Sequence, residues 1–424
     1  MANERELPTG QLARLGSVAR VGARTGLAML ARGDGSGAAE HAAELLGNLR
    51  GIAAKVGQMA SYVDGFLPEG QGDAYARALA SLQSDTPSSP FPSIREVIER
   101  ELGSSLESLF AEFDVMPLAS ASIGQVHRAR LTDGTAVAVK VQHPGIEAAI
   151  ETDLRSAAGI AALVGAMAPK KVEAKALYDE VASRFREELD YRLEAERQTA
   201  FAALHAEDPR IHIPRVFASH SARRVLTTEL ATGITLDEAA ADQDEARRRA
   251  YVELLWTFVF RGILRQGVFN ADPHPGNYLF HPDGRITFLD FGCVETMGAD
   301  YLEAVHAMHR AALAGDRERH RAAAKRGLGT DSGAYEDALL GHLWRCFEPI
   351  RSTPFRMERN YVSDLVRGIQ ELKVHMIRRG SNVTPVPRGV VFLNRLQFGF
   401  YSILARFDVD ADYRGVDREL VERL

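Results

Sequence analysis

The sequence predicts an α+β protein with two lobes behind an N-terminal helical extension. Apolar residues recur at helical spacing in the first third of the chain, a pattern typical of an amphipathic helix. Two short β-prone runs, Val126–Leu131 and Ala136–Val141, are then joined by a turn and predict a β-hairpin. From about Leu236 onward the pattern is helical, with two further strand-like runs inside it. A small sheet with one long helix, followed by a mostly helical lobe, is an α+β arrangement.

The helical extension is expected over residues 1–110. Its apolar side chains follow one another at steps of four and three residues, at Leu45, Leu49, Ile52, Val56, Met59 and Val63. The segment Thr86–Pro92 contains three prolines. Because proline ends a helix, this segment marks the expected linker.

The first lobe is expected over residues 111–230 and the second over residues 231–424. In the first lobe, the turn Thr132–Thr135 contains Asp-Gly, a strong hairpin signal. The other elements expected there are one long helix and two strands, at Ala174–Glu207, Val216–Ala218 and Arg224–Leu230. In the second lobe, Tyr278–His281 and Arg285–Leu289 flank a Pro-Asp-Gly turn and predict a second hairpin.

Bulk composition narrows the function classes. The 424 residues have a formal net charge of -6, which argues against general nucleic-acid binding because that needs a basic surface. The two cysteines are far apart, so they fit a cytoplasmic, reducing setting and exclude a disulfide framework. The longest apolar run, around Ala157–Ala168, is shorter than the about 20 residues that cross a bilayer. No transmembrane helix is therefore expected.

Two loops of the second lobe indicate phosphate chemistry. Asp272 and Asn277 stand five positions apart in Asn270-Ala-Asp-Pro-His-Pro-Gly-Asn277, and Asp290-Phe-Gly292 follows after the hairpin. Metal ions that bridge nucleotide phosphates take oxygen ligands. We therefore expect Asn277 and Asp290 to hold the Mg²⁺ of bound ATP, and Asp272 to accept or orient the proton of the attacking group. This spacing matches the D-x-x-x-x-N and D-F-G motifs of protein kinases, so the predicted fold is protein-kinase-like.

Two other interpretations of these loops stay open. Asp272 and Asn277 are common turn residues in a loop rich in proline and glycine. Alternatively, His274 and His281 are ligands of a transition metal, although no third histidine or cysteine lies at a supporting spacing.

The predicted nucleotide site also draws on the first lobe. Lys140 lies in the second strand of the hairpin, after a loop of small residues, where a lysine can reach the α- and β-phosphates. We call that loop, Ala119–Gln125, the Ala-rich loop. Its small side chains let the backbone approach phosphates, but alanine lacks the conformational freedom of glycine. The residues expected to bind nucleotide are Ala119, Ser120, Ala121, Ser122, Ile123, Gly124, Gln125, Val126, Lys140, Glu229, Asn277 and Asp290.

Charged residues of the long predicted helix and of the extension complete the candidates. Glu188, Asp190 and Glu194 are all able to pair with Lys140, and charge patterning does not choose among them. Glu188 and Asp190 point about 200° apart on a regular helix. A shared partner for them therefore requires the helix to end or distort at that point. Lys55 and Gln58 form a polar strip beside the apolar stripe. This strip is either a packed functional surface or the solvent-exposed edge of a helix.

Together these motifs resemble the UbiB (ADCK) family of atypical protein-kinase-like ATPases, from about Leu45 to Phe407. The motifs that carry the resemblance are Lys55-Val-Gly-Gln58, Phe66-Leu-Pro-Glu69, Ala119–His127, Val137-Ala-Val-Lys140, Glu188–Glu194, Asp272–Asn277 and Asp290-Phe-Gly292. The resemblance implies that Glu194 pairs with Lys140 at the catalytic centre. It also implies a regulatory contact in which Glu188 and Asp190 engage Lys55, within an extension whose Lys55–Gln58 motif fills the place of a peptide substrate.

The resemblance further implies ATPase activity and autophosphorylation, rather than phosphorylation of other proteins. It implies support of ubiquinone and related isoprenoid-lipid metabolism, often at membranes. The family usually has histidine at the position of Asn270, so different packing under the Asp-Phe-Gly turn is expected. Ala271 replaces the arginine that reads a phosphorylated activation loop in many kinases, and a helical pattern resumes soon after Gly292. Both features disfavour conventional protein kinase activity.

The expected function is therefore a UbiB-type atypical kinase or ATPase that binds Mg-ATP and supports isoprenoid quinone biosynthesis or lipid homeostasis. The alternatives are a small-molecule phosphotransferase of the aminoglycoside/choline kinase type and a non-catalytic, nucleotide-binding scaffold that presents lipids. Expected partners are the nucleotide and quinone precursors or isoprenoid lipids. A basic amphipathic stretch that contains Arg14 and Arg32 is either a peripheral membrane contact or a helix packed on the protein itself.

Overall fold

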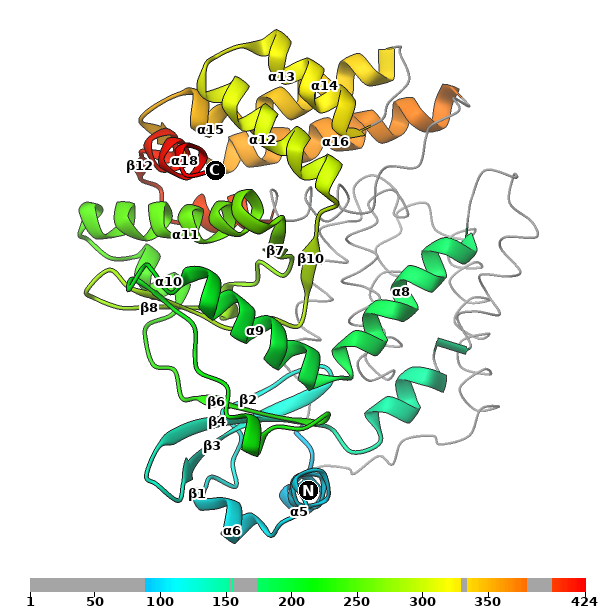
Figure 1. Ribbon diagram of the computed structural model, residues 1–424, viewed down its shortest axis with the longest axis vertical. Helices are drawn as coiled ribbons and strands as arrows, with labels where there is room; N and C mark the ends of the chain where they lie inside the picture. The colour runs from blue at the N-terminus through cyan, green and yellow to red at the C-terminus, as the bar shows by residue number, and fades with distance from the viewer. Residues whose placement is uncertain (1–87, 153, 156–173, 329–333, 380–398) are drawn as a thin grey trace, which may run out of the picture. The chain divides into compact units, whose positions relative to one another are not determined.

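The computed structural model describes residues 88–152, 154–155, 174–328, 334–379 and 399–424 (Figure 1). The chain divides into two compact units. Unit 1 runs to Tyr191 and includes Ala218–Thr227, whereas unit 2 consists of Arg192–Phe217 and Thr228–Leu424. Lys55, Gln58 and the basic N-terminal stretch lie outside the described residues. No helix in the described ranges is long and apolar enough to cross a membrane.

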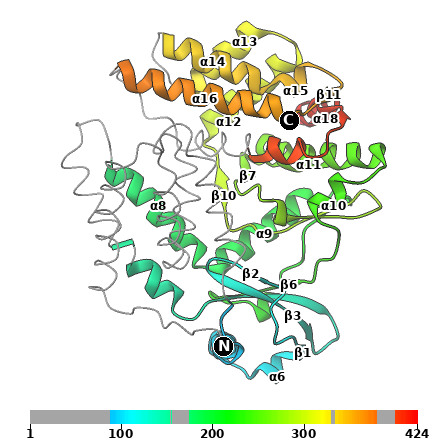
Figure 2. The same ribbon diagram turned by 180° about the vertical axis from the view of Figure 1, so that it is seen from behind.

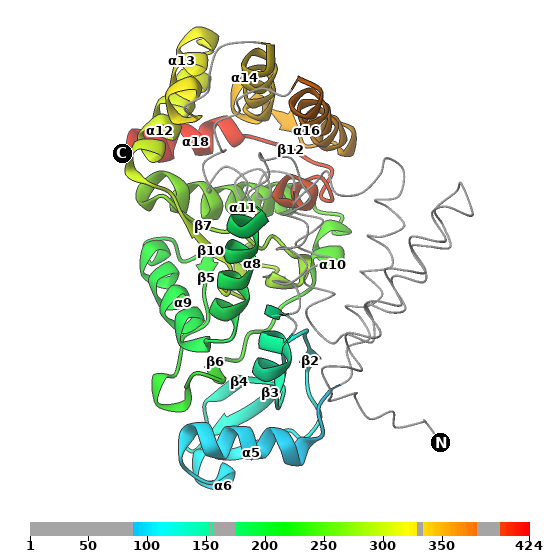
Figure 3. The same ribbon diagram turned by 90° about the vertical axis from the view of Figure 1, so that its right-hand side faces the viewer.

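A five-stranded antiparallel sheet forms the centre of unit 1. Its main path runs β1-β3-β4-β6, and β2 pairs with β3. The strands are β1 (Phe110–Phe113), β2 (Ala119–Ser120), β3 (Gly124–Leu131), β4 (Ala136–Gln142) and β6 (Val225–Glu229), whose last two residues belong to unit 2. Helix α5 (Phe91–Leu102) lies along this sheet and is followed by the short α6 (Leu106–Leu109) (Figure 3). Its buried residues Ile94, Val97 and Ile98 recur at helical spacing.

The predicted first hairpin is confirmed as β3 and β4. The register pairs Val126 with Lys140, and Val137, Val139 and Val141 are fully buried at alternate positions of β4. This alternation is what one buried face of a strand requires. In the turn, Gly134 adopts φ +88°, a conformation that favours glycine.

The predicted helix over Ala174–Glu207 is two helices, α8 (Ala174–Glu188) and α9 (Tyr191–His205). Leu189 and Tyr191 flank the break, and both are almost completely buried. The end of β4 and the turn before β6 replace the missing helical hydrogen bonds. The Gln142 amide donates to the Leu189 carbonyl at 2.9 Å, and the Tyr191 N–H donates to the Arg223 carbonyl at 2.9 Å. The helix thus ends at Glu188, where the sequence required an end or a distortion if Glu188 and Asp190 were to share a partner.

Unit 2 is built around the long helix α11 (Glu245–Gln266). Thirteen of its residues are buried, which is the pattern of a helix surrounded by protein on several sides. The Asp244 side chain accepts from the Ala246 and Arg247 N–H groups at its start, and Gly267 adopts φ 64° at its end. The other C-terminal helices gather near it: α12 (Ala299–Leu313), α13 (Arg317–Leu328), α14 (Ala334–Cys346), α15 (Glu348–Arg351), α16 (Arg359–Arg379) and α18 (Tyr413–Glu422) (Figure 2).

Short paired strands fix the ends of the loops in unit 2. The predicted second hairpin is confirmed as β8 (Tyr278–Phe280) and β9 (Ile286–Phe288), with β5 (Ile211–His212) parallel to β9. The other strand pairs are β7 (Val268–Asn270) with β10 (Val294–Thr296) and β11 (Phe355–Arg356) with β12 (Asp410–Ala411). Helix α10 (Leu236–Ala240) precedes α11.

The expected strand at Val216–Ala218 is wrong. Only Val216 makes an isolated bridge, to Thr228, and a 3-10 turn begins at Ala218. The chain therefore leaves the extended conformation after a single ladder position.

Candidate active site

The loop from Asp272 to Asn277 is closed on itself. The Asn277 side-chain amide donates to the Asp272 carbonyl at 3.0 Å, and the His274 N–H donates to the same carbonyl at 2.8 Å. A short 3-10 turn, η2 (Pro275–Asn277), ends the loop and leads directly into β8. Because the Asn277 nitrogen is used within the loop, its Oδ1 is the atom that remains to accept a cation.

Asn270 joins this loop to the Asp-Phe-Gly turn. Its Nδ2 donates to the Asp290 carbonyl at 2.7 Å, and its Oδ1 accepts from the Asp272 N–H at 3.1 Å. Asn270 is the last residue of β7 and pairs with Val294 of β10, so the sheet fixes its backbone. One side chain therefore connects the backbones of both predicted functional aspartates.

Asp290 itself adopts an uncommon backbone conformation. Its φ of 57° lies in the left-handed region, which costs a non-glycine residue about 1–2 kcal/mol. The bond from Asn270 holds its carbonyl, while its Oδ1 accepts from the Gly292 N–H at 3.0 Å. A strained residue held from two sides is typical of a functional position.

Helix α9 packs against the same turn through residues at helical spacing. The Arg197 guanidinium donates to the Gly292 carbonyl at 2.8 Å, and the Phe201 and Phe291 ring centroids are 5.1 Å apart. A Cβ atom at position 292 would lie 3.7 Å from Glu194 Oε2 and 3.2 Å from Asp290 Oδ1. The carboxylates of Glu194 and Asp290 thus both flank Gly292.

Unit 1 contains the Ala-rich loop and Lys140. The Lys140 ammonium lies 5.1 Å from the centre of the Tyr191 ring, a cation–π contact. The loop is a tight turn between β2 and β3, closed by the Ala121 N–H donating to the Gly124 carbonyl at 2.7 Å. At Gly124, a Cβ would lie 2.5 Å from the Val141 carbonyl oxygen and 2.7 Å from the Tyr191 hydroxyl, so no larger residue fits.

The residues of the Ala-rich loop differ in what they expose. Ala119 and Ala121 are exposed and Ser120 and Ser122 are half-buried, whereas Ile123, Gly124 and Gln125 are buried. The Gln125 amide is used inside the protein, where it contacts Ser89 and His127. Any contribution of Gln125 to a nucleotide would therefore come from its backbone.

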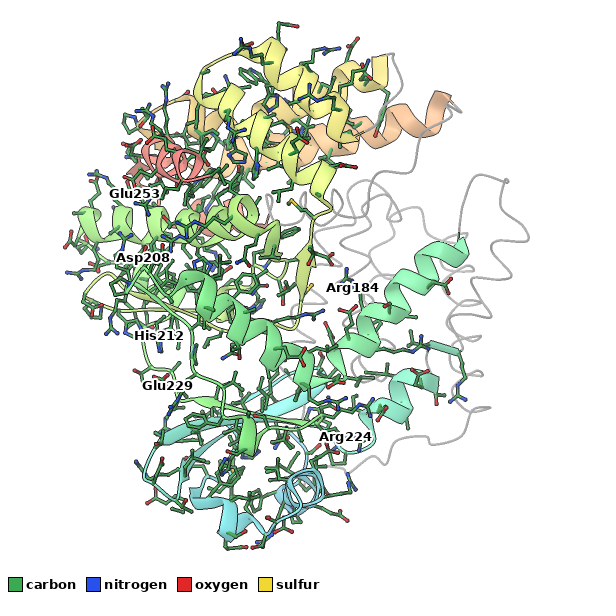
Figure 4. All side chains as sticks on the ribbon, in the orientation of Figure 1. Arg184, Asp208, His212, Arg224, Glu229 and Glu253 are labelled. Atoms are coloured by element: carbon green, nitrogen blue, oxygen red, sulfur yellow. The ribbon has the colours of Figure 1, made fainter. Side chains whose placement is uncertain are left out.

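Glu229 ends β6, and in this structure its carboxylate faces other residues of unit 2. Its Oε2 accepts from the Arg215 N–H at 3.3 Å, and its Oε1 lies 3.4 Å from His212 Nε2 (Figure 4). The side chain is 43% exposed, so this pair is weak. Its role in nucleotide binding stays a prediction.

The structure groups the predicted residues within units. Glu194, Asp272, Asn277 and Asp290 belong to unit 2, whereas the Ala-rich loop, Lys140, Glu188 and Asp190 belong to unit 1. The pairing of Lys140 with Glu194 and the contact of Glu188 and Asp190 with Lys55 stay predictions. His274 accepts from the Gly276 N–H, and His281 bonds Thr287. Within the described ranges, no group of three or more His, Cys, Asp or Glu side chains could hold a metal ion.

The sequence did not predict the contributions of three residues to this site. Arg197 and Phe201 follow Glu194 at steps of three and four, so a helix-face reading of α9 would have found them. The double role of Asn270 depends on the pairing of β7 with β10, which no local pattern announces.

Comparison with known proteins identifies the fold. The family model of the ABC1 atypical kinase-like domain matches residues 81–324. A Mycobacterium tuberculosis protein solved as a complex with erythromycin superposes with a TM-score of 0.65 at 31% identity, over 89% of this chain and 93% of that one. The predicted protein-kinase-like fold is confirmed.

Two curated sequence relatives are also kinase-like proteins. The mitochondrial atypical kinase COQ8B of Rattus norvegicus is 28% identical over all of this chain and 82% of its own length. The chloroplastic protein ACTIVITY OF BC1 COMPLEX KINASE 3 of Arabidopsis thaliana is 39% identical, over 51% of this chain but only 31% of its own length. The chain spans 31–37% of the first three curated relatives that it matches. The chain belongs to the UbiB (ADCK) family and contains its ABC1 atypical kinase-like domain.

Proposed function

We propose that this chain is a Mg-ATP-dependent atypical kinase or ATPase that supports isoprenoid quinone biosynthesis or lipid homeostasis. In unit 1, Lys140 and the backbone of the Ala-rich loop contact the phosphates. In unit 2, Asn277 and Asp290 hold the metal ion and Asp272 orients the attacking hydroxyl or water. The observation that carries the proposal is the fixed conformation of Asp290, held by Asn270 and Gly292.

The oxygen atoms of unit 2 fit a magnesium ion. Asp290 offers a carboxylate and Asn277 an amide oxygen, both of which are hard donors of the kind that Mg²⁺ prefers. When bound, the ion neutralises charge on the phosphate groups. The protein positions its donors in advance, because the Asp272–Asn277 loop and the Asp290 backbone are both held by internal hydrogen bonds.

The segment after the Asp-Phe-Gly turn supports a small or lipid substrate over a peptide. Val294–Thr296 pairs at once with β7, the Met297 N–H donates to the Gly267 carbonyl at 2.7 Å, and α12 begins at Ala299. No long activation segment separates Gly292 from α12. A role with quinones or other isoprenoid lipids draws its support from the organellar kinase-like relatives, COQ8B above all.

Two variants test the metal site and the catalytic carboxylate. Asp290→Asn removes the charge, while asparagine still tolerates the left-handed conformation, so the backbone is preserved. Asp290→Asn should therefore abolish Mg²⁺-dependent ATP binding in calorimetry. Asp272→Asn should keep binding and slow turnover by roughly 10²–10⁴, because Asn270 contacts only its backbone. Unchanged affinity of Asp290→Asn for Mg-ATP would contradict the metal assignment.

A second assay addresses the function. ATP hydrolysis is measured with and without phenolic quinone precursors and liposomes. Stimulation by either supports the quinone or lipid role. Stoichiometric phosphorylation of an added aminoglycoside or choline would instead favour the small-molecule phosphotransferase, and binding without turnover would favour a scaffold.

A further inference from the structure

His143, the first residue after β4, makes two hydrogen bonds to the Ala-rich loop and a third to Ser89. Its backbone N–H donates to the Ile123 carbonyl at 2.9 Å, and its Nε2 lies 3.1 Å from the Ala121 carbonyl oxygen. Its Nδ1 lies 2.9 Å from the Ser89 hydroxyl. His143 is 9% exposed, so these bonds are partly shielded from water. The loop is therefore anchored at two carbonyls by one side chain and its backbone.

The chemistry of the partners fixes the direction of each bond. A carbonyl oxygen only accepts, so His143 Nε2 must be the protonated nitrogen. In the neutral ring Nδ1 is then an acceptor, and the Ser89 hydroxyl donates to it.

The chain of bonds continues from Ser89 through the sheet. The Ser89 N–H donates to Gln125 Oε1 at 2.7 Å, and Gln125 Nε2 lies 2.9 Å from His127 Nε2. His127 Nδ1 lies 2.7 Å from the Asp114 carbonyl oxygen and must donate to it, so its Nε2 accepts from Gln125. Burial lowers the pKa of His127 below its usual range, which keeps its ring neutral as this pattern requires. In the chain of hydrogen bonds that runs from the Asp114 carbonyl to the Ala121 carbonyl, every donor therefore has an acceptor.

The anchored carbonyls determine where the loop amides point. In a trans peptide the N–H of one residue points opposite to the C=O of the residue before it. Since the Ala121 and Ile123 carbonyls face His143, the N–H groups of Ser122 and Gly124 face away from it. Backbone N–H groups presented together in this way favour anionic oxygens.

We propose that His143 and Ser89 are positioning residues that fix the Ala-rich loop and thereby set how this site discriminates a nucleoside triphosphate from a diphosphate. The inference rests on the proposed nucleotide function. Ser89 lies in the segment Thr86–Pro92 that the sequence predicts to be a linker, and it belongs to unit 1, so this segment is part of the loop support. A loop held in one conformation favours the phosphate chain that matches it, whereas a released loop adapts to either nucleotide.

Hydrogen–deuterium exchange tests the positioning without any nucleotide. His143→Ala should raise exchange across residues 119–125 by roughly threefold to tenfold, the equivalent of about one lost net hydrogen bond. Ser89→Ala, a milder change, should raise it less. His143→Gln keeps an amide donor for the Ala121 carbonyl and should largely restore protection. Arg128→Ala is the matched control, because its side chain is exposed on β3, and it should leave the loop unchanged.

Calorimetry with Mg-ATP and Mg-ADP on the same variants tests the discrimination. His143→Ala and, to a smaller extent, Ser89→Ala should change the ratio of the two affinities, while His143→Gln and Arg128→Ala keep the parent ratio. Parent-like exchange in His143→Ala, or raised exchange with an unchanged ratio, would overturn the proposal. If the parent binds neither nucleotide, the proposed function fails instead, and the exchange data still show whether His143 positions the loop.

Discussion

The Asn270 side chain makes hydrogen bonds to two separate segments of the backbone. It donates to the Asp290 carbonyl and accepts from the Asp272 N–H. The resemblance had suggested altered packing here, since the family usually has histidine. An amide has a donor and an acceptor on one planar group, so it can bridge two backbone groups of opposite polarity. The left-handed conformation of Asp290 depends on such a restraint.

Asn270→Ala should therefore weaken both stability and metal-dependent binding. Loss of the two hydrogen bonds should lower the free energy of unfolding by about 1–3 kcal/mol. Release of Asp290 should weaken Mg-ATP binding about tenfold, since restoring its left-handed conformation costs about 1–2 kcal/mol. Asn270→Asp keeps the acceptor for Asp272 but places a carboxylate oxygen against the Asp290 carbonyl, so it should be at least as destabilising as Asn270→Ala. Urea melts and calorimetry measure the two effects, and parent-like affinity in Asn270→Ala would contradict this role.

Among the contacts of single residues, the sequence predicted those that depend only on the spacing of nearby residues. Asp272 and Asn277 lie in one loop, so their separation alone indicated that they meet. The bridge from Asn270 joins residues twenty positions apart, and the contacts of His143 with Ser89 span fifty-four. Such contacts depend on strand pairing and linker position, which the local pattern does not encode.

Gly124 shows how closely the elements of unit 1 approach one another. A Cβ at this position would meet the Val141 carbonyl and the Tyr191 hydroxyl well inside van der Waals contact. Because a backbone carbonyl cannot move aside alone, Gly124→Ala should force β3 away from β4 and cost about 1–3 kcal/mol or more. Gly134→Ala is the control in the same hairpin: its Cβ would meet nothing within 4 Å, and only its φ of +88° is unfavourable. Denaturant melts should rank Gly124→Ala as the more destabilised variant. The reverse order would show that β3 and β4 can separate at little cost.

Elements whose signal is local were predictable, and those shaped by tertiary contacts were not. The two hairpins carried both alternation and an Asp-Gly turn, and both formed. The break between α8 and α9 had no glycine or proline to announce it. It forms because Leu189 and Tyr191 are both buried and because the last residue of β4 and the turn before β6 supply and accept the hydrogen bonds there. The mistaken strand at Val216–Ala218 looked β-prone but found a partner at one position only.

Across unit 2, buried histidines link the stability of the protein to pH. Burial, together with the nearby Arg261 cation, lowers the pKa of His205 to about 3. Burial also lowers the pKa of His320 to about 4, with a contribution from His309, and that of His342 to about 4, with a contribution from Arg345. Each ring is neutral in the folded protein at pH values where the unfolded chain is already protonated.

The unfolded state therefore binds more protons, and the free energy of unfolding should fall as the pH drops below about 6.5. The loss should continue to about pH 4, where His320 and His342 begin to protonate in the folded state. Each of the three histidines contributes about 1.4 kcal/mol per pH unit inside this window, or about 4 kcal/mol per unit together.

His205→Phe isolates one of these contributions. His205 stacks on Phe258 at 4.6 Å between ring centroids, and neither ring nitrogen has a hydrogen-bond partner among the described residues. A phenyl ring should therefore fit the site and remove its titration. The difference in the free energy of unfolding between variant and parent should be about 2 kcal/mol more in the variant's favour at pH 5 than at pH 7.5. At pH 5, protonation of His205 in the unfolded parent lowers the parent's stability by about that amount, whereas at pH 7.5 it has almost no effect. Urea unfolding at the two pH values measures this difference. An equal change at both would show that His205 does not couple folding to protonation, whatever its effect on packing.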